Sequence, residues 1–106
     1  MRIIAISTLR DYWIKHPDAE RPLRAWVGEV GQSEWRSPAD VKAQFRNASI
    51  LPGRRIIFNI KGNDYRLVVA VAYTITTVYI KFIGTHEEYD AINAREIEYT
   101  PKDKKP

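Results

Sequence analysis

Residues 84–90, GTHEEYD, place one histidine beside several carboxylates directly after an apolar run. A histidine side chain ordinarily changes its charge between about pH 5 and pH 8, so His86 is suited to general acid–base catalysis. The segment also has a purely structural interpretation, because Thr85 followed three residues later by Glu88 is the pattern of a capping box. Under that interpretation His86 is only the first residue of a helix, and the residues alone favour an uncommitted surface histidine.

A second group of chemically capable side chains lies in the stretch IIFNIKGNDYRLVVAVAY. Its polar and apolar residues alternate, and the central GN suits the two-residue turn of a type II′ β-hairpin. That turn places Asn59 opposite Arg66, on the same face as Lys61 and Asp64. Lysine and arginine here could bind phosphate, but they are equally typical of a solvated antiparallel sheet. The opposite, core-forming face is predicted to consist of Ile56, Phe58, Ile60, Tyr65, Leu67 and Val69.

The segment VYIKFI predicts a third strand that extends the polar face. If the turn before it pairs Tyr73 with Val78, then Lys81 joins the polar face and Phe82 stays with the core. Helices packed on the core side would leave the polar face uncovered. His86 would then lie just beyond the end of the third strand.

The elements that position these strands are mostly helical. We expect a short strand at residues 2–6, helices over about residues 7–16, 19–30 and from residue 38, and a short helix between about residues 89 and 94. Ser7 or Thr8 is the expected cap of the first helix, and Ser37 that of the third. Trp13 and Trp26 lie on apolar helical stripes, so both are predicted to lie in the core.

Length and composition limit the classes of function. The chain has 106 residues, of which 44% are hydrophobic, and this suits a single α+β domain. It has no cysteine, which excludes disulfides and thiolate metal sites, and its two histidines lack a carboxylate cluster at ligand spacing. There is no glycine-rich phosphate loop, no signal peptide and no apolar stretch of membrane-span length. The net charge of +4 is compatible with an anionic partner such as nucleic acid.

The order of the helices, the stretch LPGRRIIFNIKGNDYRLVVAVAY and the segment VYIKFIGTHEEYD resemble the HigB family of bacterial toxins. This family belongs to the RelE/ParE superfamily of type II toxin–antitoxin systems. The most specific parts are FNxxGNxxRxV and the THxEYD that follows it. The resemblance covers residues 1–94, expected to form a single toxin domain. Residues 95–106 form a charged tail outside it, and the last six of them are predicted to be disordered.

The resemblance implies a RelE-like fold, with N-terminal helices on one face of a small twisted antiparallel sheet and a short C-terminal helix. It implies a cytoplasmic mRNA interferase that needs no metal or cofactor and inhibits translation. Such an enzyme cuts messenger RNA in the ribosomal A site through attack of a 2′-hydroxyl on the neighbouring phosphate. The implied partners are the ribosome, the message and a HigA-like helix-turn-helix antitoxin, with operator DNA bound only through the antitoxin.

The same resemblance assigns roles to individual residues. Arg66 is the expected transition-state clamp and His86 the general acid or base. Lys61 is expected to contact phosphate or transfer a proton, and Tyr89 to stack on a base or position the ribose. The expected RNA contacts are Asn59, Lys81, Arg54 and Arg55.

Two other functions remain open at this stage. ParE-like relatives inhibit DNA gyrase by binding it, and an inactive homologue could bind an antitoxin without catalysis. The face carrying Arg66 is less cationic than that of RelE-type relatives, because Asn59 stands where a lysine is expected and Glu87 and Glu88 lie nearby. Convergence of His86, Arg66 and Lys61 on one face would favour the nuclease over the gyrase inhibitor.

Overall fold

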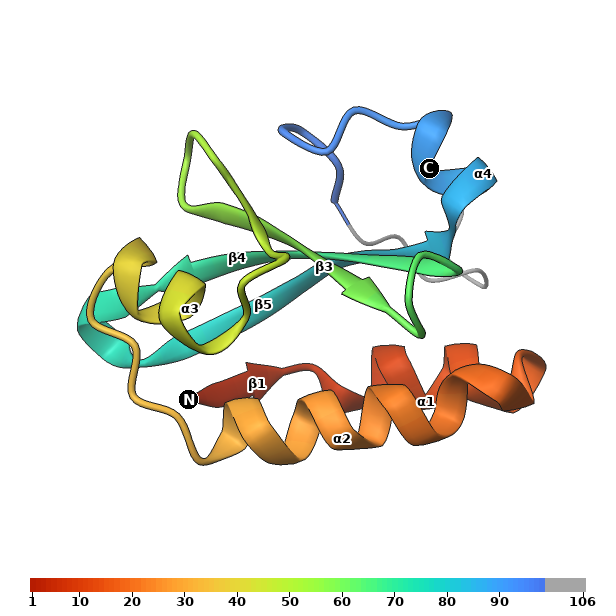
Figure 1. Cartoon of the computed structure of the whole chain (residues 1–106), viewed down its shortest axis with the longest axis horizontal. Helices are drawn as coiled ribbons and strands as arrows, with labels where there is room; N and C mark the ends of the chain where they lie inside the picture. Colours follow the sequence, from red (N-terminus) through yellow and green to blue (C-terminus); the bar gives the residue numbers. More distant parts are fainter. Residues whose placement is uncertain (99–106) are drawn as a thin grey trace.

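The computed structural model describes residues 1–98, which contain one five-stranded sheet of order β1-β5-β4-β3-β2. The strands are β1 Arg2–Ile4, β2 Ser49–Leu51, β3 Arg55–Ile60, β4 Tyr65–Ala72 and β5 Thr77–Thr85. The helices are α1 Ile6–Lys15, α2 Glu20–Gly31, α3 Pro38–Gln44 and α4 His86–Asp90. Helices α1 and α2 lie side by side on one face of the sheet, and α4 lies beyond the other face (Figure 1). The expected α+β architecture is thus confirmed, although β1 pairs with β5 in parallel, so the sheet is mixed.

The two N-terminal helices bury the residues that their periodicity indicates. Leu9 and Trp13 of α1 are buried, as is Trp26 of α2. The expected cap is wrong for the first helix, because α1 begins at Ile6 and Thr8 is buried within it. A short 3₁₀ helix, η1 Pro17–Ala19, connects α1 to α2. It brings the sequence HPD close to the hairpin turn.

The hairpin register follows the prediction. Asn59 pairs with Arg66 and Ile60 with Tyr65. The turn is closed by a hydrogen bond of 3.1 Å from the Asp64 N–H to the Lys61 carbonyl oxygen. Gly62 has a φ of 64°, which a glycine adopts without the steric cost of a Cβ. The predicted apolar face is buried, and the ring of Phe58 packs among those of Trp26, Trp35 and Phe45.

The second face of the sheet is covered, contrary to expectation. Ile57 and Val68 point to this face and are buried in a second cluster with Ala94. Phe82 packs against this second cluster rather than the main core, so its expected placement is wrong. The reason is visible in the apolar runs of β3 and β4, which are typical of strands buried on both faces.

The register between β4 and β5 also differs from the prediction. Tyr73 does not pair with Val78, because residues 73–75 form a 3₁₀ turn and Val71 takes that place. A β-bulge follows, in which Val69 lies opposite Ile80 but the preceding residue lies opposite Phe82. Lys81 therefore occupies the bulge and does not face Ala70.

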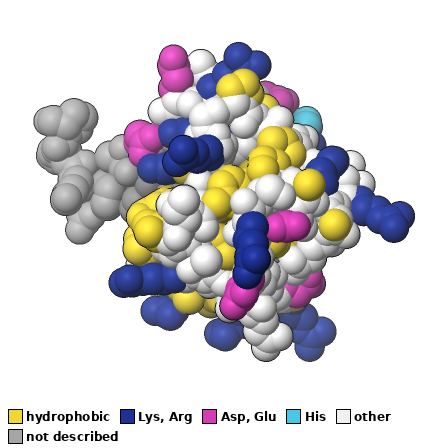
Figure 2. Space-filling view, turned by 90° about the vertical axis from the view of Figure 1, so that its left-hand side faces the viewer, with side chains coloured by type: hydrophobic (Ala, Val, Ile, Leu, Met, Phe, Trp, Pro, Cys, Tyr) yellow, Lys and Arg dark blue, Asp and Glu magenta, His cyan; other side chains and the backbone are white. Residues whose placement is uncertain are grey.

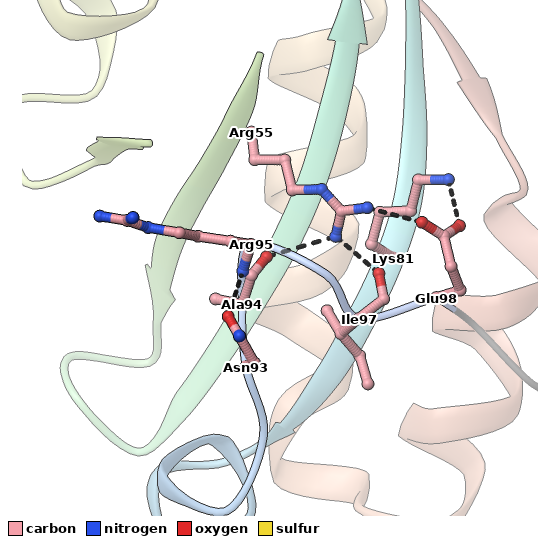
Figure 3. Close-up of polar contacts among 7 residues, drawn as sticks. All are labelled: Arg55, Lys81, Asn93, Ala94, Arg95, Ile97 and Glu98. Carbon is pink, nitrogen blue, oxygen red and sulfur yellow. Dashed lines mark hydrogen bonds and ion pairs between the residues drawn. The ribbon is translucent and has the colours of Figure 1, made fainter. Parts of the chain in front are cut away.

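The segment after α4 is fastened to the sheet by the buried Arg55 (Figure 3). Its Nη1 donates to the carbonyl oxygens of Ala94 at 3.2 Å and Ile97 at 2.6 Å. Its Nη2 contacts Glu98, which also accepts a hydrogen bond from Lys81, each at 2.6 Å. Packing therefore continues beyond the expected domain limit at residue 94. The disorder expected for residues 101–106 lies outside the described residues.

We expect Glu98→Gln to lower the free energy of unfolding at pH 7 by up to about 1 kcal/mol, a small effect because Glu98 is exposed. The hydrogen bond from Lys81, followed by that from Arg55, lowers the pKa of Glu98. A carboxylate with a lowered folded-state pKa stabilises the fold above its ordinary pKa, and this stabilisation is lost as the pH falls below about 4. Urea unfolding at neutral and acidic pH measures the difference. The matched control is Glu96→Gln, on the same segment, and a difference that persists unchanged in acid would contradict the ion pair.

Candidate active site

Arg66 of β4 and His86 of α4 line the same open hollow, whose volume is about 570 Å³. The rest of the lining comes from the hairpin turn and from the start of α4. These other lining residues are Asn63, Asp64, Tyr65, Thr85 and Glu87. The structure thus brings together two of the residues to which the family resemblance assigned catalytic roles. We call this hollow the α4 pocket.

Strand pairing explains why two segments about 20 residues apart in the sequence form one pocket. Tyr65 pairs with Thr85 and Arg66 with Gly84, so the end of β5 lies beside the start of β4. The His86 N–H donates to the carbonyl oxygen of Asp64 at 3.1 Å. This hydrogen bond continues the contact between the two walls past the end of β5.

Gly84 allows α4 to approach the sheet closely. A Cβ at this position would lie 2.5 Å from Cζ of Phe82 and 3.1 Å from Cβ of Glu88. Any larger residue would therefore have to displace the Phe82 ring or α4. The glycine of GTHEEYD sets the distance between the sheet and the helix that carries His86.

The predicted capping box holds the start of α4. Oγ1 of Thr85 accepts from the Glu88 N–H at 3.1 Å, and the Thr85 N–H donates to Oε1 of Glu88 at 2.7 Å. Both halves of the box are satisfied by main-chain groups and by these two side chains, so the His86 imidazole is not used in it. The imidazole is about half exposed, and its Nε2 lies 3.4 Å from Oδ2 of Asp90.

The Arg66 guanidinium is held at the pocket by a main-chain carbonyl group and an aromatic ring. Nη1 donates to the Asn63 carbonyl oxygen at 3.3 Å, and the guanidinium carbon lies 5.9 Å from the centre of the Tyr89 ring. Within residues 1–98 no carboxylate forms an ion pair with Arg66. Arg66 therefore keeps hydrogen-bonding capacity and charge for an anion, and Tyr89 lies beside it.

Lys61 is directed elsewhere. Its Nζ lies 2.9 Å from Oδ2 of Asp18 and 3.5 Å from Oδ2 of Asp64. The hydrogen bond to Asp18 is the main cause that raises the pKa of Lys61. Lys61 is therefore a fixed cation at the turn and does not line the α4 pocket.

The four expected RNA contacts do not form one surface with the pocket. Asn59 is exposed opposite Arg66, whereas Arg54 lies at the other end of the hairpin, where its carbonyl oxygen accepts from Val71. Arg55 and Lys81 are held by Glu98. Figure 2 shows Lys and Arg side chains spread around the end of the molecule that carries α3, with Asp and Glu side chains among them.

The sequence reasoning missed Asp18, which contacts both Lys61 and Tyr65. The HPD that contains it indicated only the end of a helix, and no local signal predicts its distant partners. In the described part of the chain, no three His, Cys, Asp or Glu side chains gather in a way that could hold a metal ion. None of the helices found within residues 1–98 is long and apolar enough to cross a membrane.

The α4 pocket combines two complementary groups. A guanidinium fork matches the oxygens of a phosphate and can make two parallel hydrogen bonds to them. An imidazole can accept or release a proton near neutral pH. The pocket is open to the surface, so a chain-like substrate can enter without threading through the protein.

The sequence matches a known protein family. The sequence model of the HigB toxin family, a RelE-like toxic component of a toxin–antitoxin system, matches residues 19–92. The mRNA interferase toxin HigB of Escherichia coli strain K12 is 28% identical over 96 residues, covering 89% of this chain and 92% of the relative. The same values hold for proteins named mRNA interferase HigB from Escherichia coli O157:H7 and Shigella flexneri. Since the matched range spans most of the chain and both walls of the α4 pocket, the chain belongs to the HigB family of RelE-like toxins of toxin–antitoxin systems.

Proposed function

We propose that this toxin is an mRNA interferase, an endoribonuclease that inhibits translation by cutting messages. The observation that carries the proposal is the convergence of Arg66 and His86 on the α4 pocket. The names of the three relatives support the same activity. Two of the three residues expected to converge, Arg66 and His86, share the pocket, whereas Lys61 does not line it. The shared pocket favours a nuclease over a gyrase inhibitor, because a protein that acts only by binding gyrase has no need of an imidazole and a guanidinium in one pocket.

The proposed reaction is a transesterification within the RNA. The 2′-oxygen of one nucleotide loses its proton and attacks the adjacent phosphorus, and the bond to the 5′-oxygen of the next nucleotide breaks. The products are a cyclic phosphate end and a 5′-hydroxyl end, with the proton returned to the leaving oxygen. His86 transfers one of these protons, and Arg66 stabilises the charge that develops on the phosphoryl oxygens.

Tyr89 and Lys61 have supporting roles in this scheme. Tyr89 lies beside the guanidinium of Arg66 and can stack on a base or position the ribose. Lys61 contributes fixed positive charge rather than proton transfer, because its ammonium is paired with Asp18 and Asp64. The nucleophile is supplied by the RNA itself, so the proposed steps use only groups of this chain and of the substrate.

We further propose that cleavage occurs in the ribosomal A site. The single guanidinium of Arg66 shares the pocket with two carboxylates, those of Asp64 and Glu87, so the lining carries no net positive charge. Non-specific affinity for RNA follows the number of phosphates that a protein neutralises, and free RNA should bind weakly. The ribosome would supply and orient the message in the cytoplasm. A HigA-like antitoxin is the proposed partner that neutralises the toxin and contacts operator DNA.

The proposal is tested with purified toxin and ribosomes stalled on a defined message. Primer extension maps the cut sites, with naked message in a parallel reaction and the double variant His86→Ala, Arg66→Ala as the inactive control. We expect cuts within the A-site codon, few or none in naked message, and none with the double variant. Absence of wild-type cleavage together with inhibition of gyrase supercoiling would overturn the proposal in favour of a ParE-like function. Absence of both RNA cleavage and gyrase inhibition would indicate a homologue that only binds its antitoxin.

A further inference from the structure

A single carboxylate in the helical layer contacts both sides of the hairpin turn. Asp18 belongs to the short 3₁₀ helix η1, between α1 and α2. Its Oδ1 accepts a hydrogen bond of 2.6 Å from the Tyr65 hydroxyl, and its Oδ2 accepts one of 2.9 Å from Nζ of Lys61. Lys61 precedes the turn and Tyr65 follows it, so Asp18 fixes the turn relative to the helices.

The turn that Asp18 fixes is also one wall of the α4 pocket. Residues 63–66 line the pocket, and Tyr65 pairs with Thr85, the cap residue of α4. The main-chain hydrogen bond from His86 to Asp64 joins the same two segments. A displacement of the turn would therefore move the guanidinium of Arg66 and the start of α4 together.

Aromatic packing connects the same layers. The Tyr12 ring of α1 meets the Tyr65 ring edge to face at 5.8 Å between centroids and stacks on His16 at 4.1 Å. The Tyr12 hydroxyl lies 3.4 Å from Oε1 of Glu88, the second residue of the capping box. Both walls of the pocket thus contact the helical layer. Among these contacts, the two hydrogen bonds to Asp18 are short and charge-assisted.

The protonation states favour both hydrogen bonds at neutral pH. The hydrogen bond to Asp18 is the main cause that raises the pKa of Tyr65 to about 12. The same hydrogen bond, followed by that from Lys61, lowers the pKa of Asp18. The phenol therefore keeps its proton and the carboxylate keeps its charge, which makes these bonds stronger than bonds between neutral groups.

We propose that Asp18 is a positioning residue for RNA cleavage, which holds the hairpin wall of the α4 pocket through Tyr65 and Lys61 so that Arg66 and His86 keep their relative placement. The inference rests on the proposed function for its effect on the reaction. Asp18 does not line the pocket, so its action on the substrate is indirect. Small displacements of positioned groups slow reactions strongly, by as much as ~10²-fold for about 1 Å.

The test compares Asp18→Ala, Asp18→Asn and the control Asp11→Asn, which removes a charge from an exposed position on α1. Single-turnover cleavage on programmed ribosomes gives the rate at saturation and the half-saturating concentration. Amide hydrogen exchange followed by NMR reports on the His86 N–H, with the Val68 N–H in the middle of β4 as a reference. We expect Asp18→Ala to slow cleavage by about 10-fold to 100-fold, to leave half-saturation nearly unchanged, and to speed exchange at His86 but not at Val68. The Asp18→Asn side chain can still accept the hydrogen bond from Tyr65, so this variant should lose less of the cleavage rate.

A double-mutant cycle distinguishes positioning from general destabilisation. Tyr65→Phe should slow cleavage in the wild-type background and have little further effect in Asp18→Ala, because the contact is already absent. Wild-type rates in Asp18→Ala, or exchange that rises equally at His86 and Val68, would overturn the inference. If wild-type toxin does not cleave RNA at all, the proposed function fails instead. The exchange measurement then still decides whether Asp18 holds the pocket wall.

Discussion

Replacing His86 with alanine is expected to slow cleavage of ribosome-bound message by about 10²-fold to 10⁴-fold, the usual contribution of a positioned acid or base. The imidazole lines the α4 pocket, is about half exposed and takes no part in the capping box. Its removal should therefore leave the fold intact. Quantitative primer extension measures the rate, and circular dichroism with thermal unfolding checks the fold.

Thr85→Ala is the matched comparison for the histidine. It removes the side chain that caps α4, at a cost of about 1 kcal/mol in stability, but leaves the imidazole in place. We expect it to retain most of the cleavage activity that His86→Ala loses. Equal losses in the two variants would mean that the segment 84–90 matters only for the placement of α4. Cleavage that survives His86→Ala would assign the proton transfer to another group near Arg66 and Tyr89.

Replacing Arg66 with alanine is expected to slow cleavage by about 10²-fold to 10³-fold, as the loss of one preorganised hydrogen-bond donor at a developing oxyanion does in other enzymes. Within residues 1–98 its guanidinium has a carbonyl and an aromatic ring as neighbours but no ion-pair partner. It is therefore available to a phosphate. Arg66→Lys keeps the charge but loses the planar fork, so it should recover only part of the rate.

Arg46→Ala serves as the control for charge alone. Arg46 follows α3, and α3 lies at the end of the molecule away from α4 (Figure 1). Both substitutions remove one positive charge from the chain, but only Arg66→Ala removes it from the pocket. A similar loss of rate in both variants would mean that overall charge, and not a clamp on the reacting phosphate, governs cleavage. Unfolding in urea checks that neither variant is destabilised.

The register of the β3–β4 hairpin could be predicted from the sequence because its turn contains only two residues. With so short a connection, one pairing determines all the others, and Asn59 opposite Arg66 follows from the position of Gly62. The capping box of α4 is equally local, since its two partners are three residues apart. These two short-range rules place Arg66 opposite Asn59 and His86 at the start of a helix, but they do not bring the two residues together.

The pairing of β4 with β5 could not be predicted in the same way. The connection between them contains a 3₁₀ turn, and a bulge at Val68 and Val69 changes the register within the strands. Longer turns take several forms of similar energy, so the packing of both sheet faces selects among them. The prediction for Lys81 failed for this reason, and Arg55 proved to be a buried clamp on residues 94–98 rather than a surface cation.

By itself, the amino-acid sequence determined the helical stripes, the hairpin register and the cap that presents His86. Each of these depends on residues close together in the chain, where propensity and steric rules act directly. Only the tertiary structure decided which cations remain available. Lys61 is 43 residues from Asp18 in the chain and Tyr65 is 47 residues from it, yet one carboxylate binds both. Contacts across such separations form because the hydrophobic burial of entire helices and strands brings the partners together, and no local pattern records them.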